Sequence, residues 1–244
     1  MERKRIAIVG VGLIGGSLAI QLHEKKISSR LIGVDANADH AQQAIDLELV
    51  DEVMNLGDAI AASDVIVLAI PVDKVVAILP PIMDKIEMQV VIDLGSTKSQ
   101  SIECIKNHPK RGRFVATHPM WGTEYSGPGA AVRGAFENKA VIICNPEESD
   151  ADALMWVKGM YKKIGMHLLE MEAKAHDLHA AYVSHISHIT SFALANTVLQ
   201  KEKEDNAIFE LASAGFESTV RLAKSNPAMW VPIFMQNKEN VLDV

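Results

Sequence analysis

The stretch that decides the fold is RIAIVGVGLIGG, residues 5–16. It begins with a short strand-forming run over residues 5–9 and continues into a predicted helix over residues 13–26. Between them stand three glycines at the spacing that a close strand-to-helix turn requires: Gly10, Gly12 and Gly15. A strand, this glycine spacing and a helix in that order predict the first unit of a doubly wound α/β sheet.

Each part of this turn is suited to a bound dinucleotide. The first glycine makes the tight turn, the second lets a pyrophosphate approach the backbone, and the third lets helix and strand pack closely. Leu13 and Ile14 open the helix, whose free N–H groups would face the phosphates. Asp35 ends the next predicted strand, where a carboxylate binds the adenosine ribose hydroxyls and repels a 2′-phosphate. The sequence therefore predicts NAD rather than NADP, and Pro71, after the third strand, is expected to shape the loop beside the cofactor.

The rest of the chain divides into two parts. Up to residue 171, predicted strands (5–9, 31–34, 64–70, 89–92, 114–117, 140–144 and 166–169) alternate with predicted helices (13–26, 37–47, 72–85 interrupted by Pro80 and Pro81, and 149–164). After it we predict only helices: 172–200, a polar connection over 201–206, 207–224, and a last helix capped by Asn226 and kinked at Pro232. The prediction is an N-terminal Rossmann-type domain (1–171) and an all-helical dimerisation domain (172–244).

Composition narrows the class of protein. The formal net charge is −7, and there is no basic tract, so nucleic acid and anionic membranes are poor candidates as partners. The two cysteines, Cys104 and Cys144, form no pairing motif, which favours a reduced, cytoplasmic protein. Residues 178–200 have no formally charged side chain, but their histidines, serines and threonines make them too polar to cross a membrane.

The long predicted helix over residues 172–200 carries little polarity on any side. One stripe consists of Leu178, Tyr182, Ile186, Ile189 and Ala193, and small residues form another: Ala180, Ser184, Ser187 and Ser191. Such a helix needs cover on most sides, and the helices after residue 171 cannot supply all of it. We therefore predict that a second copy of the chain covers it, as a homodimer.

A metal site has to be weighed because four histidines cluster in this helix: His176, His179, His185 and His188. On a straight helix, residues nine apart point to opposite sides, so the four cannot converge on one ion. A pair three residues apart is an incomplete zinc site. The sequence therefore predicts no metal.

Three further segments carry chemistry. DLGSTK (residues 93–98) and HPMWGTEYSG (residues 118–127) each follow a predicted strand, and the carboxyl ends of strands are where open α/β sheets bind ligands. SHISH (residues 184–188) lies in the long helix. Together with Arg221 and Trp230, these motifs resemble the prephenate/arogenate dehydrogenase family of tyrosine biosynthesis, over nearly the whole chain.

The resemblance implies a reaction and a site. The reaction is the oxidative decarboxylation of prephenate to 4-hydroxyphenylpyruvate, with NAD as hydride acceptor and no metal. His118 would accept the proton of the ring hydroxyl, for which a neutral imidazole is suited, and Ser96 would orient His118 and contact both nicotinamide and substrate. The resemblance gives the remaining residues substrate-binding roles: Arg221 to hold a carboxylate, His188 to line the side-chain end of the pocket, His185 and Glu124 to lie nearby or gate it, and Trp230 to close one wall. Many members have an aspartate where this chain has Ser218, which bears on how Arg221 is positioned.

Other interpretations stay open at this point. His118 could bond only to backbone, Ser96 could only cap a helix, Arg221 could serve an interface salt bridge, and His185 and His188 could be packing residues. Arogenate is the alternative substrate. A β-hydroxyacid dehydrogenase would need a catalytic lysine in the long helix, and an NAD-sensing module without activity would keep only the cofactor residues.

Overall fold

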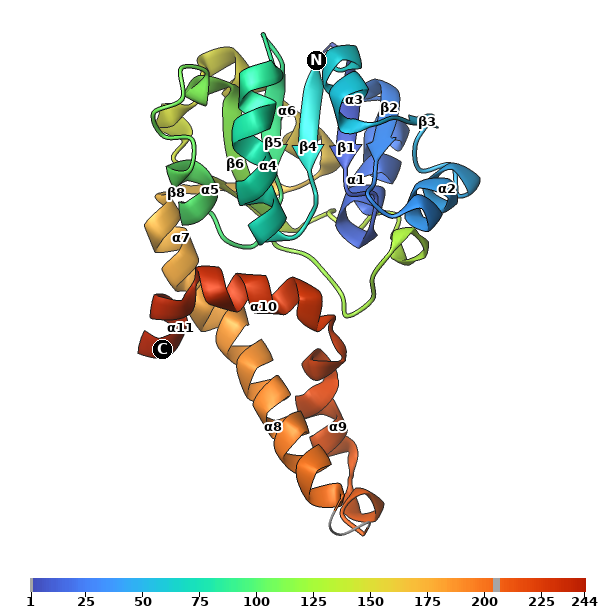
Figure 1. Cartoon of the computed structure of the whole chain (residues 1–244), viewed down its shortest axis with the longest axis vertical. Coiled ribbons are helices and arrows are strands. Elements are labelled where there is room, and N and C mark those ends of the chain that lie inside the picture. Colours follow the sequence, from blue (N-terminus) through green and yellow to red (C-terminus); the bar gives the residue numbers. More distant parts are fainter. Residues whose placement is uncertain (1, 204–206) are drawn as a thin grey trace.

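The structure is a computed structural model that describes residues 2–203 and 207–244 (Figure 1). Within these residues one eight-stranded sheet has the order β3-β2-β1-β4-β5-β6-β7-β8. The strands are β1 (Lys4–Val9), β2 (Ser28–Val34), β3 (Glu52–Val53), β4 (Val65–Leu68), β5 (Val90–Asp93), β6 (Phe114–Pro119), β7 (Ala140–Cys144) and β8 (His167–Met171). Neighbours pair in parallel except β6 and β7, which are antiparallel. The carboxyl ends of β1, β4, β5 and β6 therefore lie along one edge.

Helices cover both faces of this sheet, which confirms the doubly wound prediction. They are α1 (Leu13–Glu24), α2 (Ala38–Asp46), α3 (Leu56–Ala62), α4 (Val72–Lys85), α5 (Ser99–Glu103) and α6 (Ala151–Ile164). In β1, Ile6 and Ile8 face the core beneath α1 and α6, whereas Ala7 and Val9 face the core beneath α3 and α4. Because both faces are covered, these strands are apolar at successive positions.

Two details of this domain differ from the sequence predictions. The short strand β3 and the helices α3 and α5 were not predicted, since none of them is long enough to show a period. Helix α4 continues through Pro80 and Pro81, so the predicted interruption is wrong. The two prolines remove the N–H donors that the carbonyls of Val76 and Ala77 would use, but Ala77 is exposed. Water can therefore replace at least one of the lost donors.

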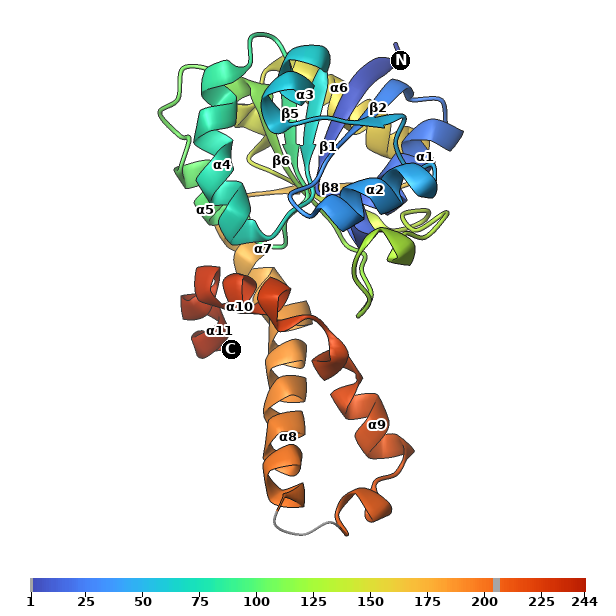
Figure 2. The same cartoon turned by 45° about the vertical axis from the view of Figure 1, so that its right-hand side comes forward.

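After β8 the chain is helical: α7 (Ala173–Ala180), a π-helical turn (Ala181–His185), α8 (Ile186–Glu202), α9 (Ala214–Val220), α10 (Pro227–Gln236) and α11 (Lys238–Asp243). Helix α8 projects away from the sheet, and α9 returns beside it; we call this pair the helical arm (Figure 2). Residues 204–206, part of the predicted polar connection, lie outside the described residues. Asn226 caps α10 and Pro227 is its first residue, as predicted. That helix passes through Pro232 and ends at Gln236.

The helices of this part are more broken than predicted. A single helix over 207–224 is wrong, because Ala212 and Ser213 have extended backbones that separate a short 3₁₀ turn from α9. The predicted helix over 172–200 is continuous with a π turn inside it. Of the described residues, no helix is long and apolar enough to span a membrane.

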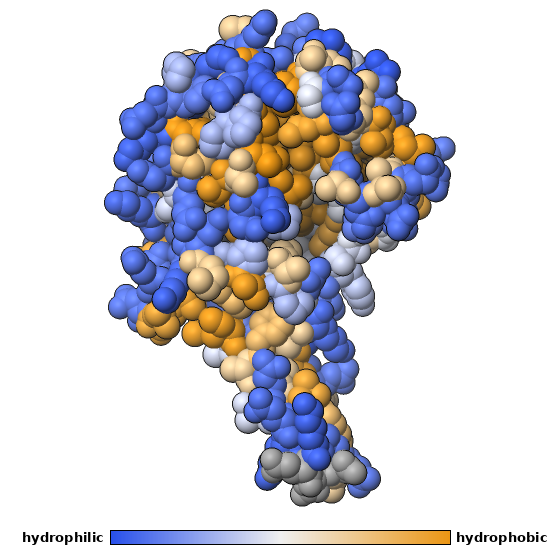
Figure 3. All heavy atoms as spheres, in the orientation of Figure 1, coloured by the Kyte–Doolittle hydropathy of each residue, from blue (hydrophilic) through white to orange (hydrophobic). Residues whose placement is uncertain are grey.

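One chain leaves much of its helical part uncovered. Tyr182 is 56% exposed and Val183 is 68% exposed, and Ser191 is the buried residue of α8. The hydroxyl of Ser191 donates to the carbonyl of Thr219 and accepts from the backbone N–H of Ala223, so α8 contacts the returning chain at this residue. Apolar side chains also emerge from α10 and α11 (Figure 3): Met229, Val231, Met235 and Leu242.

Candidate active site

The glycine turn after β1 leaves space for a ligand at one position only. Gly10 has φ +91°, and a Cβ there would lie 2.5 Å from the carbonyl oxygen of Ala69. A Cβ on Gly15 would lie 2.0 Å from the carbonyl oxygen of Gly10. At Gly12 the nearest atom within 4 Å would be the backbone nitrogen of Gly127, at 4.0 Å. Gly10 and Gly15 thus serve packing, whereas the backbone at Gly12 stays open to a phosphate group.

The start of α1 offers donors to that space. Gly12 is the N-cap and, within the described chain, no side chain caps the helix and no acidic residue occupies its first turn. The N–H groups of Leu13 and Ile14 are therefore available to an anion. Pro71 stands at the N-cap of α4, just past the end of β4.

Asp35 joins this turn to the end of β2. Its Oδ2 accepts a hydrogen bond from the backbone N–H of Val11 (3.1 Å), and its Oδ1 accepts one from Asn37 (3.0 Å). The carboxylate is thereby fixed beside the glycine turn, where an adenosine ribose would lie. These residues fit the dinucleotide that the sequence predicts.

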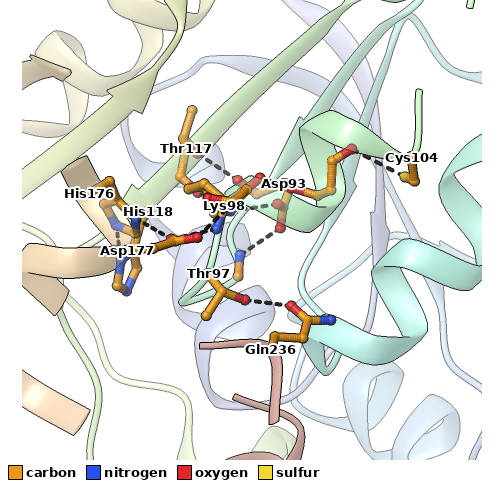
Figure 4. A network of polar contacts seen from close by, with 12 residues as sticks. Asp93, Thr97, Lys98, Cys104, Thr117, His118, His176, Asp177 and Gln236 are labelled. Carbon is orange, nitrogen blue, oxygen red and sulfur yellow. Dashed lines mark hydrogen bonds and ion pairs between the residues drawn. The ribbon is translucent and has the colours of Figure 1, made fainter. Parts of the chain in front are cut away.

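A buried ion pair lies beneath the ends of β5 and β6 (Figure 4). Lys98 Nζ lies 2.5 Å from Asp93 Oδ2 and donates to the carbonyl of Thr117 (2.8 Å); the two charged side chains are 0% and 1% exposed. The Thr117 hydroxyl donates to the carbonyl of Asp93 (2.8 Å). Ser96 lies between the two members of this pair in the sequence, and His118 directly follows Thr117, so the pair holds the backbone segments that carry both residues.

His118, at the end of β6, belongs to a chain of hydrogen bonds. Its Nδ1 lies 2.9 Å from the Nε2 of His176, and the Nδ1 of His176 lies 2.9 Å from Asp177 Oδ1. Burial is the main cause that keeps the pKa of His118 well below its usual value, and electrostatic contributions from His176, Lys98 and His185 act in the same direction. The imidazole of His118 is therefore neutral near pH 7, the form that accepts a proton.

Asp177 also binds the sheet domain. It accepts hydrogen bonds from the backbone N–H groups of Lys98 (2.8 Å) and Ser99 (2.9 Å). Burial disfavours its ionised form, but the hydrogen bonds from His176, Ser99 and Lys98 outweigh that effect and lower its pKa. A second contact joins the same turn to α10, since the Thr97 hydroxyl donates to Gln236 Oε1 (2.6 Å). The helical part therefore holds the turn that carries Ser96 by hydrogen bonds from two helices.

Histidines of the long helix meet Trp230 on the helical side. His188 stacks on Trp230 with ring centroids 3.5 Å apart, and its Nδ1 donates to the carbonyl of Ser184 (3.1 Å), which leaves Nε2 as an acceptor. His185 is 1% exposed, and its Nδ1 lies 3.0 Å from the Nδ2 of Asn237. Burial lowers the pKa of His185 to about 4. His188 is thus partly accessible, whereas His185 is packed behind Trp230.

Arg221 approaches this group from the helical arm. Its guanidinium lies 3.6 Å from the carboxylate of Glu124, in the loop after β6 (residues 120–131). Burial lowers the pKa of His188, and the charge of Arg221 adds to the effect. The Arg221 side chain is 57% exposed, so it remains free to bind an anion. Ser218 is exposed, and its hydroxyl donates to the carbonyl of Gly215.

Ser96 follows β5, and His118 lies near the end of the neighbouring strand β6, so both stand at the sheet edge that carries the glycine turn. Four residues of the site were not identified from the sequence: Lys98, His176, Asp177 and Asn237. His176 was considered only as a metal ligand, and its neighbour Asp177, next to a histidine in the first turns of the long helix, was the available signal. Among residues 2–203 and 207–244, no three His, Cys, Asp or Glu side chains are arranged to hold a metal ion.

Known families match both parts of the chain. Residues 18–170 match the nucleotide-binding domain of prephenate dehydrogenase, and residues 172–244 match the prephenate dehydrogenase dimerization domain. The chain is 31% identical over 242 residues to prephenate dehydrogenase of Bacillus subtilis (strain 168), which covers 98% of this chain and 65% of that relative. It therefore spans less than two thirds of that relative's length.

Two other similarities bear on substrate and cofactor. The chain is 29% identical over 244 residues to a cyclohexadienyl dehydrogenase of Zymomonas mobilis, covering 99% of this chain and 83% of the relative. The solved structure of prephenate dehydrogenase from Aquifex aeolicus, in complex with hydroxyphenyl propionate and NAD+, superposes with a TM-score of 0.89 at 30% identity. That superposition covers 100% of this chain and 86% of the other.

Proposed function

The chain belongs to the prephenate dehydrogenase family, and we propose that it catalyses the oxidative decarboxylation of prephenate to 4-hydroxyphenylpyruvate with NAD as hydride acceptor. The observation that carries this proposal is the neutral, desolvated His118 at the same sheet edge as the glycine turn. A proton acceptor beside a dinucleotide site is what the oxidation of an alcohol requires.

The chemistry assigns a task to each residue. Prephenate carries a ring hydroxyl on the carbon that loses a hydride, and His118 Nε2 accepts the proton of that hydroxyl as the carbonyl forms. Ser96 hydrogen-bonds at the same oxygen and holds it against His118. The ring carboxylate then leaves as carbon dioxide, and its bonding electrons complete the aromatic ring. NAD, when bound, supplies the hydride acceptor.

Cofactor binding falls to the turn after β1. Gly12 lets the pyrophosphate approach, and the N–H groups of Leu13 and Ile14 donate to it. Asp35 binds the ribose hydroxyls and disfavours the 2′-phosphate of NADP. The NAD+ in the Aquifex aeolicus complex supports the same cofactor for this chain.

Substrate anions fall to the helical part. Arg221 offers a planar fork that matches a carboxylate, and Trp230 with His188 forms a flat wall beside it. Glu124 holds Arg221 until an anion displaces it, and His185 supports Trp230 from behind. Cofactor binding and binding of the substrate carboxylates are thus assigned to different domains, and we propose that the boundary between these domains lies between residues 171 and 172.

We also propose that the working form is a homodimer through residues 172–244. The exposed apolar residues of α8, α10 and α11 support it, as does the match of this part to a dimerization domain. Light scattering after size exclusion should give twice the chain mass at micromolar concentration. A monodisperse monomer would contradict the proposal.

The function is tested by following NADH absorbance with NAD and either prephenate or arogenate. Turnover of prephenate supports the proposal. Turnover of arogenate alone would keep the mechanism and change the substrate. If NAD binds and neither compound yields NADH, the chain is a cofactor-binding module and the proposed reaction is wrong.

A further inference from the structure

Asp177 determines which ring nitrogen carries the proton in the series of hydrogen bonds that leads to His118. It is 3% exposed, and its lowered pKa keeps it ionised, so both oxygens only accept hydrogen bonds. Three donors surround it: the backbone N–H groups of Lys98 and Ser99, and the Nδ1 of His176. The proton between Asp177 and His176 therefore resides on His176 Nδ1.

The next bond follows from the first. A His176 ring that carries a single proton, on Nδ1, has a lone pair on Nε2, which lies 2.9 Å from His118 Nδ1. His118 must then donate from Nδ1, and its own lone pair is left on Nε2. The two rings meet edge to face, at 75°, with centroids 5.1 Å apart, a geometry that is compatible with a hydrogen bond between ring nitrogens.

We propose that His176, held by Asp177, is the positioning residue that sets the tautomer of His118 and so presents Nε2 as the base to the substrate hydroxyl. This inference rests on the proposed function and extends it to residues behind the reacting group. His176 is 2% exposed and touches His118 rather than the substrate side. An imidazole in the wrong tautomer has the right shape and no base at the reacting atom.

The arrangement also couples the two parts of the chain. His176 and Asp177 lie in α7, whereas His118 lies near the end of β6 and the N–H groups that hold Asp177 belong to the segment after β5. The base is therefore oriented only when α7 is docked on the sheet. Asn237 secures the docked position, because its Nδ2 donates to the carbonyl of Asp177 (2.7 Å).

Two substitutions at one position separate orientation from packing. His176→Leu removes the acceptor for His118 Nδ1, and kcat should fall about 10²-fold or more, with KM for prephenate nearly unchanged. His176→Gln can accept from His118 through Oε1 and donate to Asp177 through Nε2, so it should keep kcat within about tenfold of the wild type. His179→Leu and His179→Gln, at an exposed position of the same helix, are the matched controls and should leave kcat unchanged.

A spectroscopic measurement tests the tautomer without turnover. In protein labelled with ¹⁵N in histidine rings, His118 should carry its proton on Nδ1 and His176 should be neutral with its proton on Nδ1. Loss of the Nδ1 preference of His118 in His176→Leu, and its retention in His176→Gln, are the expected results. A doubly protonated His176, or equal losses of kcat in the two variants, would overturn the inference. Absence of prephenate turnover in the wild type would refute the proposed function, and the ring-nitrogen result would still stand or fall by itself.

Discussion

The guanidinium of Arg221 lies 3.6 Å from the carboxylate of Glu124, and this contact joins the end of α9 to the loop after β6. Arg221 is the more exposed partner, with 57% of its side chain accessible against 21% for Glu124. An exposed ion pair of this kind contributes little stability. Little stability is therefore lost when Arg221 separates from Glu124, as the proposed binding of a substrate carboxylate requires.

Replacing Arg221 should impair substrate binding more than chemistry. Arg221→Gln removes a charge-assisted hydrogen bond, which is equivalent to a rise in KM for prephenate of about 10- to 100-fold. KM for NAD should change little. Lys224→Gln, an exposed cation in the next turn, is the control, and steady-state kinetics with each substrate varied is the measurement. Equal changes in the two variants would contradict the assignment.

His118→Asn should abolish most of the turnover and leave binding intact. Losing a general base costs about 10²- to 10⁴-fold in kcat, while the amide occupies similar space. Because the pKa of His118 is lowered, the wild-type kcat/KM should hold at pH 6 and fall only as the pH drops through that lowered pKa. A wild-type rate that falls already between pH 8 and pH 7 would contradict this account of the base.

Asp35 should decide between the two nicotinamide cofactors. Asp35→Ser removes the acceptor for the ribose hydroxyls and the negative charge that opposes a 2′-phosphate. We expect kcat/KM for NAD to fall about tenfold and the preference over NADP to shrink. Asp39→Asn, an exposed acidic residue in the first turn of α2, controls for the loss of a charge. An unchanged preference in Asp35→Ser would show that other residues select the cofactor.

The sequence predictions succeeded where one local pattern decides the structure. The predicted strand over residues 64–70 is apolar at every position after Asp64, and Val65–Leu68 form β4, buried on both faces. Asn226 and Pro227 start α10 because capping is local. The break at Ala212 and Ser213 was missed, although Ser213, a preferred N-cap residue, and Gly215, a poor helix former, were available signals.

In the active site, too, the residues set by a local sequence pattern were predicted and those that meet through tertiary contacts were not. Gly10, Gly12, Gly15 and Asp35 have fixed spacings within one strand-helix-strand unit, so the sequence places them together. His176 reaches His118 across 58 positions, and no local period predicts that contact. The π turn at Ala181–His185 changes the direction of the later histidines, and a straight helix was the only geometry that the sequence could suggest.

Lys98 should be required for stability. Lys98→Met leaves the buried Asp93 carboxylate without its partner, which costs about 3–5 kcal/mol. Lys106→Met breaks an exposed pair with Glu103 and should cost less than about 1 kcal/mol. Urea unfolding of both variants at one protein concentration measures the difference. Similar losses of unfolding free energy in the two variants would mean that the buried pair contributes no more to stability than the exposed one.

His185 should make the protein acid-sensitive. Its folded pKa is about 4, against 6.5 for the free side chain, so the unfolded chain binds a proton between these values and the folded chain does not. The stabilisation is complete above pH 6.5 and is lost as the pH falls toward 4, by roughly 2 kcal/mol at pH 5. His185→Asn should flatten this part of the curve of unfolding free energy against pH, and an unaltered slope would contradict the burial of a neutral ring.

The most direct test of the central claim is the stoichiometry of one reaction mixture. The chain is incubated with NAD and a limiting amount of prephenate, and NADH, carbon dioxide and 4-hydroxyphenylpyruvate are quantified in the same sample. Oxidative decarboxylation at this site predicts equal amounts of all three, and their loss together in His118→Asn. Saturable NAD binding with none of the three products formed from prephenate would contradict it.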